Sequence, residues 1–387
     1  MLERTLIMKT KYNIYLMYII TLLQGMVFYS SISTLYRQSQ GMTLVQMGII
    51  ESVFSVLIFI FEIPWGYICD RIGYKKTLII CYGIYMISKI IFWKAHCFSM
   101  FLLERILLAV VVSGLSGCDT AFIYMSTKGK NSTHIFGIYQ ALGTLGLIIS
   151  STIYSLFIKE QYQLAGFLTI IPYAIAFVLS LFLKDVEYQQ EDKTNIKIKD
   201  ISTLFPKKHI LLFIISATLL TETTHTLSIF YNQLQYQKVG IPISYYGILY
   251  SFMTLLALSS GFIGKILNHV KEESVLYMIY ILSLTACLLM SFSQSIPLTI
   301  LSIAILYISE ALFYPMMYTK YNQSVKTSRA LTLSMYSMLM NITAFFTNLS
   351  FGYFADIDVQ FAILLGAVLI LIAFLCFYTY NKKDKVR

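Results

Sequence analysis

A short polar break separates two long apolar stretches in the first quarter of the chain: Glu62-Ile63-Pro64-Trp65-Gly66-Tyr67-Ile68-Cys69-Asp70-Arg71-Ile72-Gly73-Tyr74-Lys75-Lys76. Gly66 is small enough for a neighbouring helix to approach closely, as small residues do in membranes. Asp70 falls where an apolar helix would meet water, and negative charge there is favoured by the N-terminus of a facing helix. Gly73 permits a tight turn. The stretch therefore predicts two apolar helices joined by a short basic loop.

The composition excludes a water-soluble protein. The chain has 387 residues, of which 57% are hydrophobic and only 12% are charged, and its mean hydropathy is +0.71. Soluble globular chains carry about 25% charged residues. Apolar runs of roughly 20 residues recur along the sequence, the length that crosses a ~30 Å hydrocarbon core. We therefore expect an all-α, polytopic membrane protein, and not a soluble enzyme, a nucleic-acid-binding domain or a disordered chain.

Twelve apolar segments are candidate membrane-spanning helices, because lipid offers no partner to an unpaired backbone group. The first is too long for the core of a signal peptide, so we expect it to be retained. The segments cover residues 12–36, 45–69, 77–97, 99–126, 134–158, 163–183, 209–235, 243–266, 274–294, 296–320, 329–354 and 359–380.

Basic residues indicate which loops face the cytoplasm. With the N-terminus inside, most of the 29 Lys and Arg residues fall in inner segments. The basic residues of the outer segments are few: Arg37, Lys94, Lys159 and Lys238. We therefore expect a multi-pass protein of the cell membrane with both termini cytoplasmic. The net charge of +10 is then a topology signal, and it does not require a nucleic-acid partner.

The longest polar stretch, residues 184–208, carries charges of both signs and is typical of a solvated linker. It divides the chain into an N-terminal six-helix bundle, 1–183, and a C-terminal six-helix bundle with a cytoplasmic tail, 209–387. Secondary transporters have this organisation, with the substrate site near the bilayer midplane between the halves. A weak internal repeat agrees with it, since Gly261-Phe-Ile-Gly264-Lys265 repeats the glycine of the 62–76 stretch but has a lysine in place of the acid.

The 62–76 stretch resembles the signature of the major facilitator superfamily, Gly-x-x-x-Asp-Arg-x-Gly-Arg-Lys, which joins the second and third helices of that family. The resemblance extends along nearly the whole chain in topology. It implies the major facilitator fold and transport by alternating access. In the family the signature cluster is implied to latch the two halves in the outward-open state, and its residues here are Glu62, Gly66, Asp70, Arg71, Gly73 and Lys75.

Two other stretches are similar to patterns of the same family. Arg105 followed by Ser113-Gly114-Leu-Ser-Gly117-Cys-Asp119-Thr-Ala121 resembles the fourth span, and the match implies a proton-transfer or substrate role for Arg105. A set of residues from the tenth span onward resembles the corresponding stretch of bacterial twelve-helix drug-exporting members: Glu310, Pro315, Asn322, Arg329 and Ala330.

The sequence departs from the family pattern in three places. Tyr74 replaces the usual arginine after the signature glycine, and Met125 stands where an acidic partner is common. Losing both avoids a buried unpaired charge, so we expect a weaker and more apolar latch. The fifth span contains Gly137, Gly143 and Gly146 but no Gly-Pro pair, which exporters often carry, so antiport is not established by this segment.

Acidic residues inside the C-terminal spans are the first candidates for function, because charge in a span is costly. Glu222 lies in the seventh span, and His225 follows three residues later on the same helix face. Glu310 lies in the tenth span, and Pro315 is expected to kink that helix. A buried carboxyl group can bind a proton in the physiological range. These acids could therefore exchange a proton for a cationic substrate, or serve as structural hydrogen-bonded acids.

Ionisable residues of the N-terminal spans have weaker signals. Glu51 and Glu62 share one face of the second span, and Glu62 is expected near the inner gate. Lys89 is expected to snorkel toward the outer surface or to pair with Glu104. Asp119 is expected in the inner half of the fourth span, lining the cavity or assisting the inner gate.

Aromatic and amide residues near the midplane are candidates for the wall of a substrate site. In the first span these are Gln24, Phe28 and Tyr29; in the seventh they are Phe230, Tyr231 and Asn232. Most of the 30 Tyr and 27 Phe residues are expected to be packing or interface residues.

The leading hypothesis is a secondary active transporter that exports small amphipathic or cationic compounds in exchange for protons. The alternatives are a carrier of one metabolite, in either direction, and a non-transporting receptor on the same fold. The expected partners are a small-molecule substrate, protons and the lipid bilayer, and we expect a monomer.

Several other functions lack their motifs. The sequence has no His-Glu-x-x-His, no Gly-x-Ser-x-Gly and no Gly-x-x-x-x-Gly-Lys-Ser/Thr, so neither an intramembrane enzyme nor ATP hydrolysis is indicated. The six cysteines form no metal or disulfide pattern, and we expect no cofactor. The Asn-x-Ser/Thr matches at Asn131, Asn341 and Asn348 lie in an inner loop or in a span, so they are not read as glycosylation sites.

Overall fold

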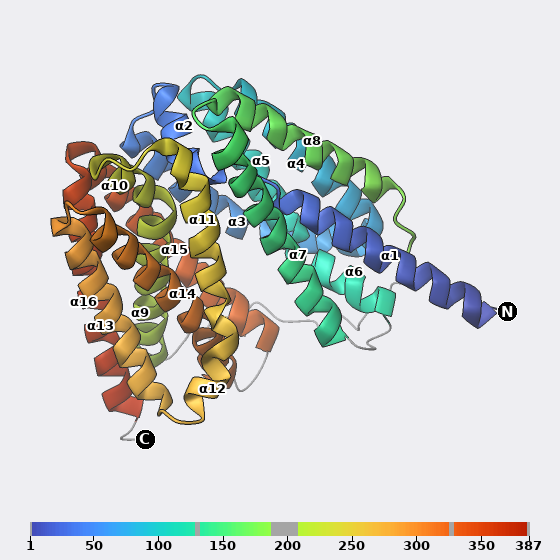
Figure 1. Ribbon diagram of the computed structural model, residues 1–387. Helices are drawn as coiled ribbons and strands as arrows, with labels where there is room; N and C mark the ends of the chain where they lie inside the picture. The colour runs from blue at the N-terminus through green and yellow to red at the C-terminus, as the bar shows by residue number, and fades with distance from the viewer. Residues whose placement is uncertain (1, 128–131, 187–207, 325–328, 385–387) are drawn as a thin grey trace. The chain divides into compact units, whose positions relative to one another are not determined.

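The computed structural model describes residues 2–127, 132–186, 208–324 and 329–384, and every regular element within these ranges is helical (Figure 1). The first six predicted spans appear as α1 (Leu2–Gly25), η1 (Ser30–Ile32), α2 (Ser33–Ser39), α3 (Leu44–Ile72), α4 (Tyr74–Lys94), α5 (Phe98–Leu115), α6 (Cys118–Thr127), α7 (Ser132–Ile153), η2 (Tyr154–Ile158) and α8 (Tyr162–Leu181). The predicted linker lies almost wholly outside the described residues.

The last six predicted spans also appear as helices. They are α9 (Lys208–His225), η4 (Thr226–Tyr231), α10 (Asn232–Lys238), η5 (Ile243–Tyr245), α11 (Tyr246–Ala257), η6 (Leu258–Phe262), α12 (Ile263–Leu267), α13 (Glu272–Phe292), α14 (Ile296–Ser324), α15 (Arg329–Ile357) and α16 (Val359–Asp384). The all-α prediction is confirmed.

Within the described residues, 11 helices are long and apolar enough to cross a membrane. The predicted span at 329–354 is not among them, although α15 is a helix of 29 residues. Two asparagines, Asn341 and Asn348, lower the hydropathy of this helix. These polar residues lower the mean hydropathy of α15, and their role depends on the groups that they contact.

The chain forms two compact units. Unit 1 consists of Met1–Gly41, Val56–Thr194 and Ile243–Ser251, and unit 2 consists of Met42–Ser55, Asn195–Pro242 and Phe252–Arg387. Each unit thus combines most of one sequence half with one short helical segment from the other half. The first part of α3, up to Ser55, belongs to unit 2, and the start of α11 belongs to unit 1.

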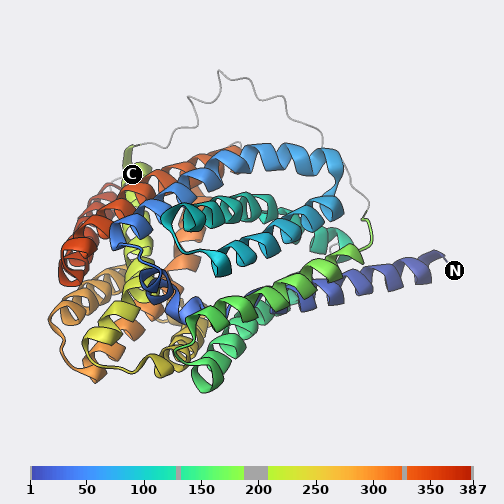
Figure 2. The same cartoon turned by 90° about the horizontal axis from the view of Figure 1, so that it is seen from above.

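Helix packing follows the same plan in both units. In unit 1, α1 packs against α7 and α8, while α4 packs against α5 and α8, and α8 runs alongside α1 (Figure 2). In unit 2, α9 packs against α15 and α16, while α13 packs against α14 and α16. Helices with the same rank in each sequence half therefore take the same neighbours, as expected of an internal repeat.

Five predicted spans, the first, fourth, fifth, seventh and eighth, are interrupted rather than continuous within the described residues. The first span breaks between Gly25 and Ser30, and the fourth breaks at Gly117, whose φ of +76° is one that side chains disfavour. The seventh span changes at Thr226–Tyr231 into a π-helix. Hydropathy does not reveal such breaks, because they leave the apolar composition unchanged.

Glycines bring α1 and α7 into backbone contact. A Cβ atom added to Gly146 would overlap the Leu22 carbonyl oxygen, and one added to Gly25 would overlap the Gly143 carbonyl oxygen. In lipid, helix association depends on van der Waals packing, and small residues permit this close approach. Gly143 and Gly146 of the fifth span are therefore packing residues.

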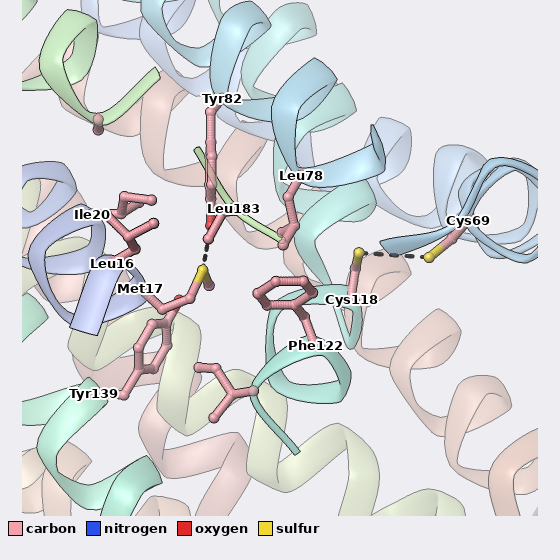
Figure 3. Close-up of a cluster of buried hydrophobic side chains, with 12 residues drawn as sticks. Leu16, Met17, Ile20, Cys69, Leu78, Tyr82, Cys118, Phe122, Tyr139 and Leu183 are labelled. Atoms are coloured by element: carbon pink, nitrogen blue, oxygen red, sulfur yellow. Dashed lines mark hydrogen bonds between the residues drawn. The ribbon is translucent and has the colours of Figure 1, made fainter. Parts of the chain in front are cut away.

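The core of unit 1 lies between α1, α4, α6 and α7. Met17, Tyr82 and Phe122 are each less than 2% exposed, and the Tyr82 hydroxyl donates to the Met17 sulfur at 3.9 Å (Figure 3). At the edge of this cluster the Sγ atoms of Cys69 and Cys118 lie 3.5 Å apart, which joins the C-terminal end of α3 to α6 (Figure 3).

A close helix contact forms at Gly114. Among the described residues no atom lies within 4 Å of a Cβ position at Gly66, whereas a Cβ at Gly114 would lie 2.6 Å from the Cys81 sulfur and 2.8 Å from the Trp65 ring. Gly66 is exposed on α3, while the indole of Trp65, one residue earlier, turns toward α5. The bulky neighbour, and not the small residue, makes the contact.

The glycines of α7 allow a direct test of backbone packing. We expect Gly146→Val to lower the stability of the purified protein by about 1–3 kcal/mol, because the added side chain meets backbone and not a movable side chain. Gly137→Val, on the same helix with open space at its Cβ, is the matched control. Thermal unfolding in detergent measures both, and equal midpoints for the two variants would contradict this packing.

Candidate functional site

Four polar side chains meet inside unit 2. Glu222 and His225 lie on α9, Glu310 on α14 and Asn348 on α15. The first three were predicted as functional residues. Asn348 was not, because its only sequence signal was a glycosylation pattern placed in a span.

His225 and Glu310 form an ion pair between α9 and α14. The His225 Nδ1 lies 3.3 Å from the Glu310 Oε1. The imidazole side chain is 43% exposed, while the Glu310 side chain is 13% exposed. The pair is therefore open on the histidine side, so His225 is the accessible member.

Glu222 lies beside this pair. Its carboxylate interacts electrostatically with His225 and Glu310 and lies near the side chain of Asn348. Asn348 accepts a hydrogen bond from the Thr226 hydroxyl at 3.4 Å. The two acids therefore belong to one charge cluster.

Further titratable groups surround the cluster. Glu51, on the part of α3 that belongs to unit 2, interacts electrostatically with Glu222 and His225. Tyr314, one turn after Glu310 on α14, interacts with both Glu222 and Glu310. The Phe230 ring lies edge-on to the imidazole of His225, with centroids 5.9 Å apart.

A π-helical segment begins directly after His225. Residues Thr226–Tyr231 have the wider i→i+5 turn, and Asn232–Lys238 resume the α-helix. Single π turns inside α-helices are rare and are frequent at functional sites. The segment separates the charged end of α9 from the buried amides of α10, including Asn232 and Gln235.

The cluster has the chemistry of a proton or cation site. The carboxylates of Glu222 and Glu310 and the imidazole of His225 share a region inside membrane-spanning helices, where unbalanced negative charge is costly. The excess can be neutralised by protons or by a positively charged solute. Among the described residues no three His, Cys, Asp or Glu side chains converge as a metal-ligand set.

Unit 1 contains a second buried charge, at Lys89. The expectation that Lys89 snorkels is wrong, since it is only 4% exposed. Its ammonium donates to the Tyr29 hydroxyl at 3.0 Å and lies 4.9 and 5.0 Å from the ring centroids of Tyr85 and Tyr173. Three aromatic faces and a phenol oxygen take the place of water. Glu104 on α5 adds an attractive electrostatic interaction.

Other predicted residues of unit 1 lie around this cage. Tyr29 is buried and stacks on Phe92 at a centroid distance of 3.8 Å. The backbone carbonyl of Gln24 accepts a hydrogen bond from the Tyr173 hydroxyl at 2.6 Å. Arg105 is partly buried and interacts electrostatically with Lys89.

Asp119 lies in the first turn of α6, directly after the break at Gly117. Its carboxylate accepts a hydrogen bond from the Tyr139 hydroxyl at 3.0 Å and one from the Thr120 backbone amide at 2.6 Å. A negative charge at a helix N-terminus is favourable. Asp119 thus ties α6 to α7, and it does not join the Lys89 cage through these contacts.

The signature loop has the predicted turn. Gly73 has a φ of +86° between the end of α3 and the start of α4, and its backbone amide donates to the Cys69 carbonyl at 2.9 Å. Arg71 is exposed, and Glu62 and Lys75 are partly buried. The side chain of Asp70 lies outside the described part of the structure, so its gating role stays a prediction.

Comparison with known proteins identifies the family. A profile described as Major Facilitator Superfamily matches residues 14–326 and 237–387. The chain belongs to the major facilitator superfamily. As a member of this family it is a membrane transporter and not an enzyme.

Relatives of this major facilitator transport different solutes. The chain is 24% identical over 363 residues to an uncharacterized MFS-type transporter of Methanocaldococcus jannaschii, covering 90% of this chain and 92% of the relative. It is 24% identical to the quinolone resistance protein NorA of Staphylococcus aureus, covering 44% of this chain and 43% of NorA. It is 23% identical to a sucrose permease of Escherichia coli, covering 61% and 60%.

Solved structures agree on the fold. The nucleoside transporter NupG superposes with a TM-score of 0.81 at 16% identity, covering 97% of this chain and 99% of NupG. A bacterial homologue of the lysosomal transporter Spinster superposes with a TM-score of 0.75 at 16% identity, covering 97% and 98%. At this identity the likeness concerns architecture alone.

The lysine cage generates a stability prediction. We expect Lys89→Met to lower the thermal midpoint of the purified protein, because the desolvated cation–π contacts contribute about 2 kcal/mol and the buried Glu104 loses an attractive charge. Lys94→Met is the matched control, since Lys94 lies 4.6 Å over the Trp93 ring on the same helix but is exposed. A Lys89→Met midpoint no lower than that of Lys94→Met would contradict the cage.

Proposed function

We propose that this transporter is a secondary active exporter that exchanges protons for small amphipathic or cationic compounds by alternating access. The observation that carries the proposal is the His225–Glu310 pair beside Glu222 in unit 2. It has more carboxylates than cations, and a dissolved cation or protons would restore the balance. Proton binding and cation binding then compete for the same acids, which is the minimum requirement for exchange.

Aromatic groups next to these acids support an amphipathic substrate. Phe230 is partly buried beside His225, and Tyr314 stacks with Tyr318 at a centroid distance of 6.2 Å. Aromatic faces attract cations and also bury apolar surface. The partial similarity to NorA points in the same direction, while it covers less than half of either chain.

A carrier of one metabolite is the second candidate. It is favoured by the similarity to a sucrose permease and an L-fucose-proton symporter of Escherichia coli. The buried hydroxyl and amide groups after His225 are also suited to a neutral polar solute, because Asn232 and Gln235 are each 3% exposed or less. In that case the acids would couple proton entry to uptake, and a lipophilic cation would not be moved.

The proposed orientation places both termini in the cytoplasm of a cell-membrane protein. It rests on the distribution of Lys and Arg between alternate loops. The short segment between α4 and α5, which contains Cys97, would then face the outside.

Proton coupling is tested with Glu310→Gln in proteoliposomes. We expect efflux of a fluorescent lipophilic cation driven by a pH gradient to fall about tenfold or more, because the variant keeps the size of the side chain and loses its charge-assisted contact with His225. Glu160→Gln, an exposed acid outside the predicted spans, is the control and should transport normally.

The same assay distinguishes the two candidates. If the wild-type protein moves the cation at the same rate with and without the pH gradient, the proposal of proton coupling is wrong. If wild-type protein moves no cation but accumulates a sugar or nucleoside in response to the gradient, the metabolite carrier replaces the exporter.

The orientation is tested with the native thiol of Cys97. A hydrogen bond with Ser99 at 3.2 Å lowers the pKa of the Cys97 thiol, so more reactive thiolate is present at neutral pH. We expect a membrane-impermeant maleimide added to intact cells to label wild type and to leave Cys97→Ser unlabelled. Labelling of Cys97 only after the cells are opened would reverse the proposed topology.

A further inference from the structure

Two cysteine thiols meet beside the turn at Gly73. The Cys69 thiol, in the last turn of α3, donates to the Cys118 sulfur at 3.5 Å (Figure 3). Cys118 is the first residue of α6, and its thiol donates to the backbone carbonyl of Tyr74 at 3.8 Å. Since Cys69 precedes the turn and Tyr74 follows it, one thiol of α6 contacts both sides of this turn.

Both thiols are buried, and each lies close in sequence to a glycine turn with open space around it. Gly73 follows Cys69 by four residues, and Gly117 directly precedes Cys118. Both glycines have positive φ values, and no described atom lies within 4 Å of a Cβ position on either one. The sulfurs are therefore shielded from bulky reagents, while the backbone next to each of them has room to shift.

The contact between the two sulfurs is suited to formation of a covalent bond. The S–S bond of a disulfide is about 2 Å long, so the two atoms need to approach by about 1.5 Å. Rotation of the two side chains and small changes at the two glycine turns can supply this movement. The pair therefore has the arrangement of a dithiol that can be oxidised to a disulfide.

We infer that Cys69 and Cys118 form an oxidation site, at which a peroxide converts the two thiols to a disulfide that joins the end of α3 to the start of α6. With hydrogen peroxide, one sulfur attacks the O–O bond, an S–O bond forms, and a sulfenic acid and one water result. The second thiol attacks the sulfenic sulfur, the S–S bond forms, and a second water leaves. The two thiols lose two electrons, the peroxide gains two, and both thiol protons end in the waters.

The cellular side of the membrane determines when this reaction takes place. The proposed orientation puts the end of α3 on the cytoplasmic side, where thiols are kept reduced and most disulfides are transient. The pair is then a dithiol at rest and a disulfide under oxidising conditions. The bond would oppose any transport step in which α3 and α6 move apart, a consequence that rests on the proposed function, whereas formation of the disulfide does not.

Two other buried cysteines are useful references. Cys81 lies on α4, and a Cβ atom on Gly114 would lie 2.6 Å from its sulfur, so this thiol packs against α5. Cys287 lies on α13 in unit 2 and is also buried. Burial alone therefore does not distinguish the pair, and the contact between the Cys69 and Cys118 sulfurs does.

The experiment measures disulfide formation in the full-length protein in detergent, without substrate or gradient. Reduced protein is treated with hydrogen peroxide at neutral pH, the remaining thiols are blocked with iodoacetamide, and linked peptides are identified by mass spectrometry with and without reduction. We expect the peptides of Cys69 and Cys118 to account for most of the disulfide formed. Cys69→Ser and Cys118→Ser should each lose it, and Cys287→Ser, the matched control, should keep it.

Oxidation should also raise the midpoint of thermal unfolding by about 2 °C or more, because the bond joins residues 49 positions apart and restricts the unfolded chain. This shift should be reversed by dithiothreitol and should be absent from both single serine variants of the pair. Three results overturn the inference: no linked peptide, a disulfide that joins Cys81 to either thiol, or oxidation of the pair to sulfinic or sulfonic acids without a disulfide.

The effect on transport is measured separately in proteoliposomes. Peroxide should lower gradient-driven efflux of the lipophilic cation by wild type, dithiothreitol should restore it, and Cys118→Ser should not respond. Unchanged efflux with the disulfide present would overturn the effect on transport. A reduced wild-type protein that moves no cation would instead contradict the proposed function and leave the disulfide result standing.

Discussion

The absence of water around the helices is the constraint on which the rest of the structure depends. Inside a membrane every ionised side chain needs a partner from the protein, because no solvent can supply one. Each unit meets this demand with different chemistry. Unit 1 surrounds Lys89 with phenol rings, whereas unit 2 pairs Glu310 with an imidazole beside Glu222. The first arrangement is closed, and the second retains an exposed imidazole edge.

This difference distinguishes a charge with a structural role from a charge that can take part in transport. Lys89 is enclosed by phenol rings, which carry no charge at neutral pH. His225 and Glu310 can both gain or lose a proton, and each change alters the attraction between α9 and α14. A pair of this kind can link an electrostatic event to the packing of two helices, which a cation held by aromatic rings cannot.

Much of the fold could be predicted from the sequence, because hydropathy and the placement of Lys and Arg act over whole segments. The turn at Gly73 and the acids in the seventh and tenth spans were also accessible, since a glycine after a charged pair and a charge in an apolar run are strong local signals. The breaks within the helices and the contact partners of individual side chains could not be predicted. Trp65 packs against Gly114. This contact depends on the direction in which the Trp65 side chain points, which the sequence does not show. Asn348 gave no signal, since an amide becomes informative only when its neighbours are known.

The π turn at Thr226–Tyr231 has a consequence for how this chain tolerates insertions and deletions. A wider turn accommodates an extra residue in the helix, so the side chains that follow are rotated by about 100° from the face they would otherwise occupy. Removing one residue from the segment would restore an ordinary helix and would turn Asn232 and Gln235 away from their buried positions. In a sequence alignment, relatives that lack the π turn should therefore have a one-residue gap at Thr226–Tyr231. A chimaera joined within this segment would combine the polar residues of α9 from one protein with those of α10 from another.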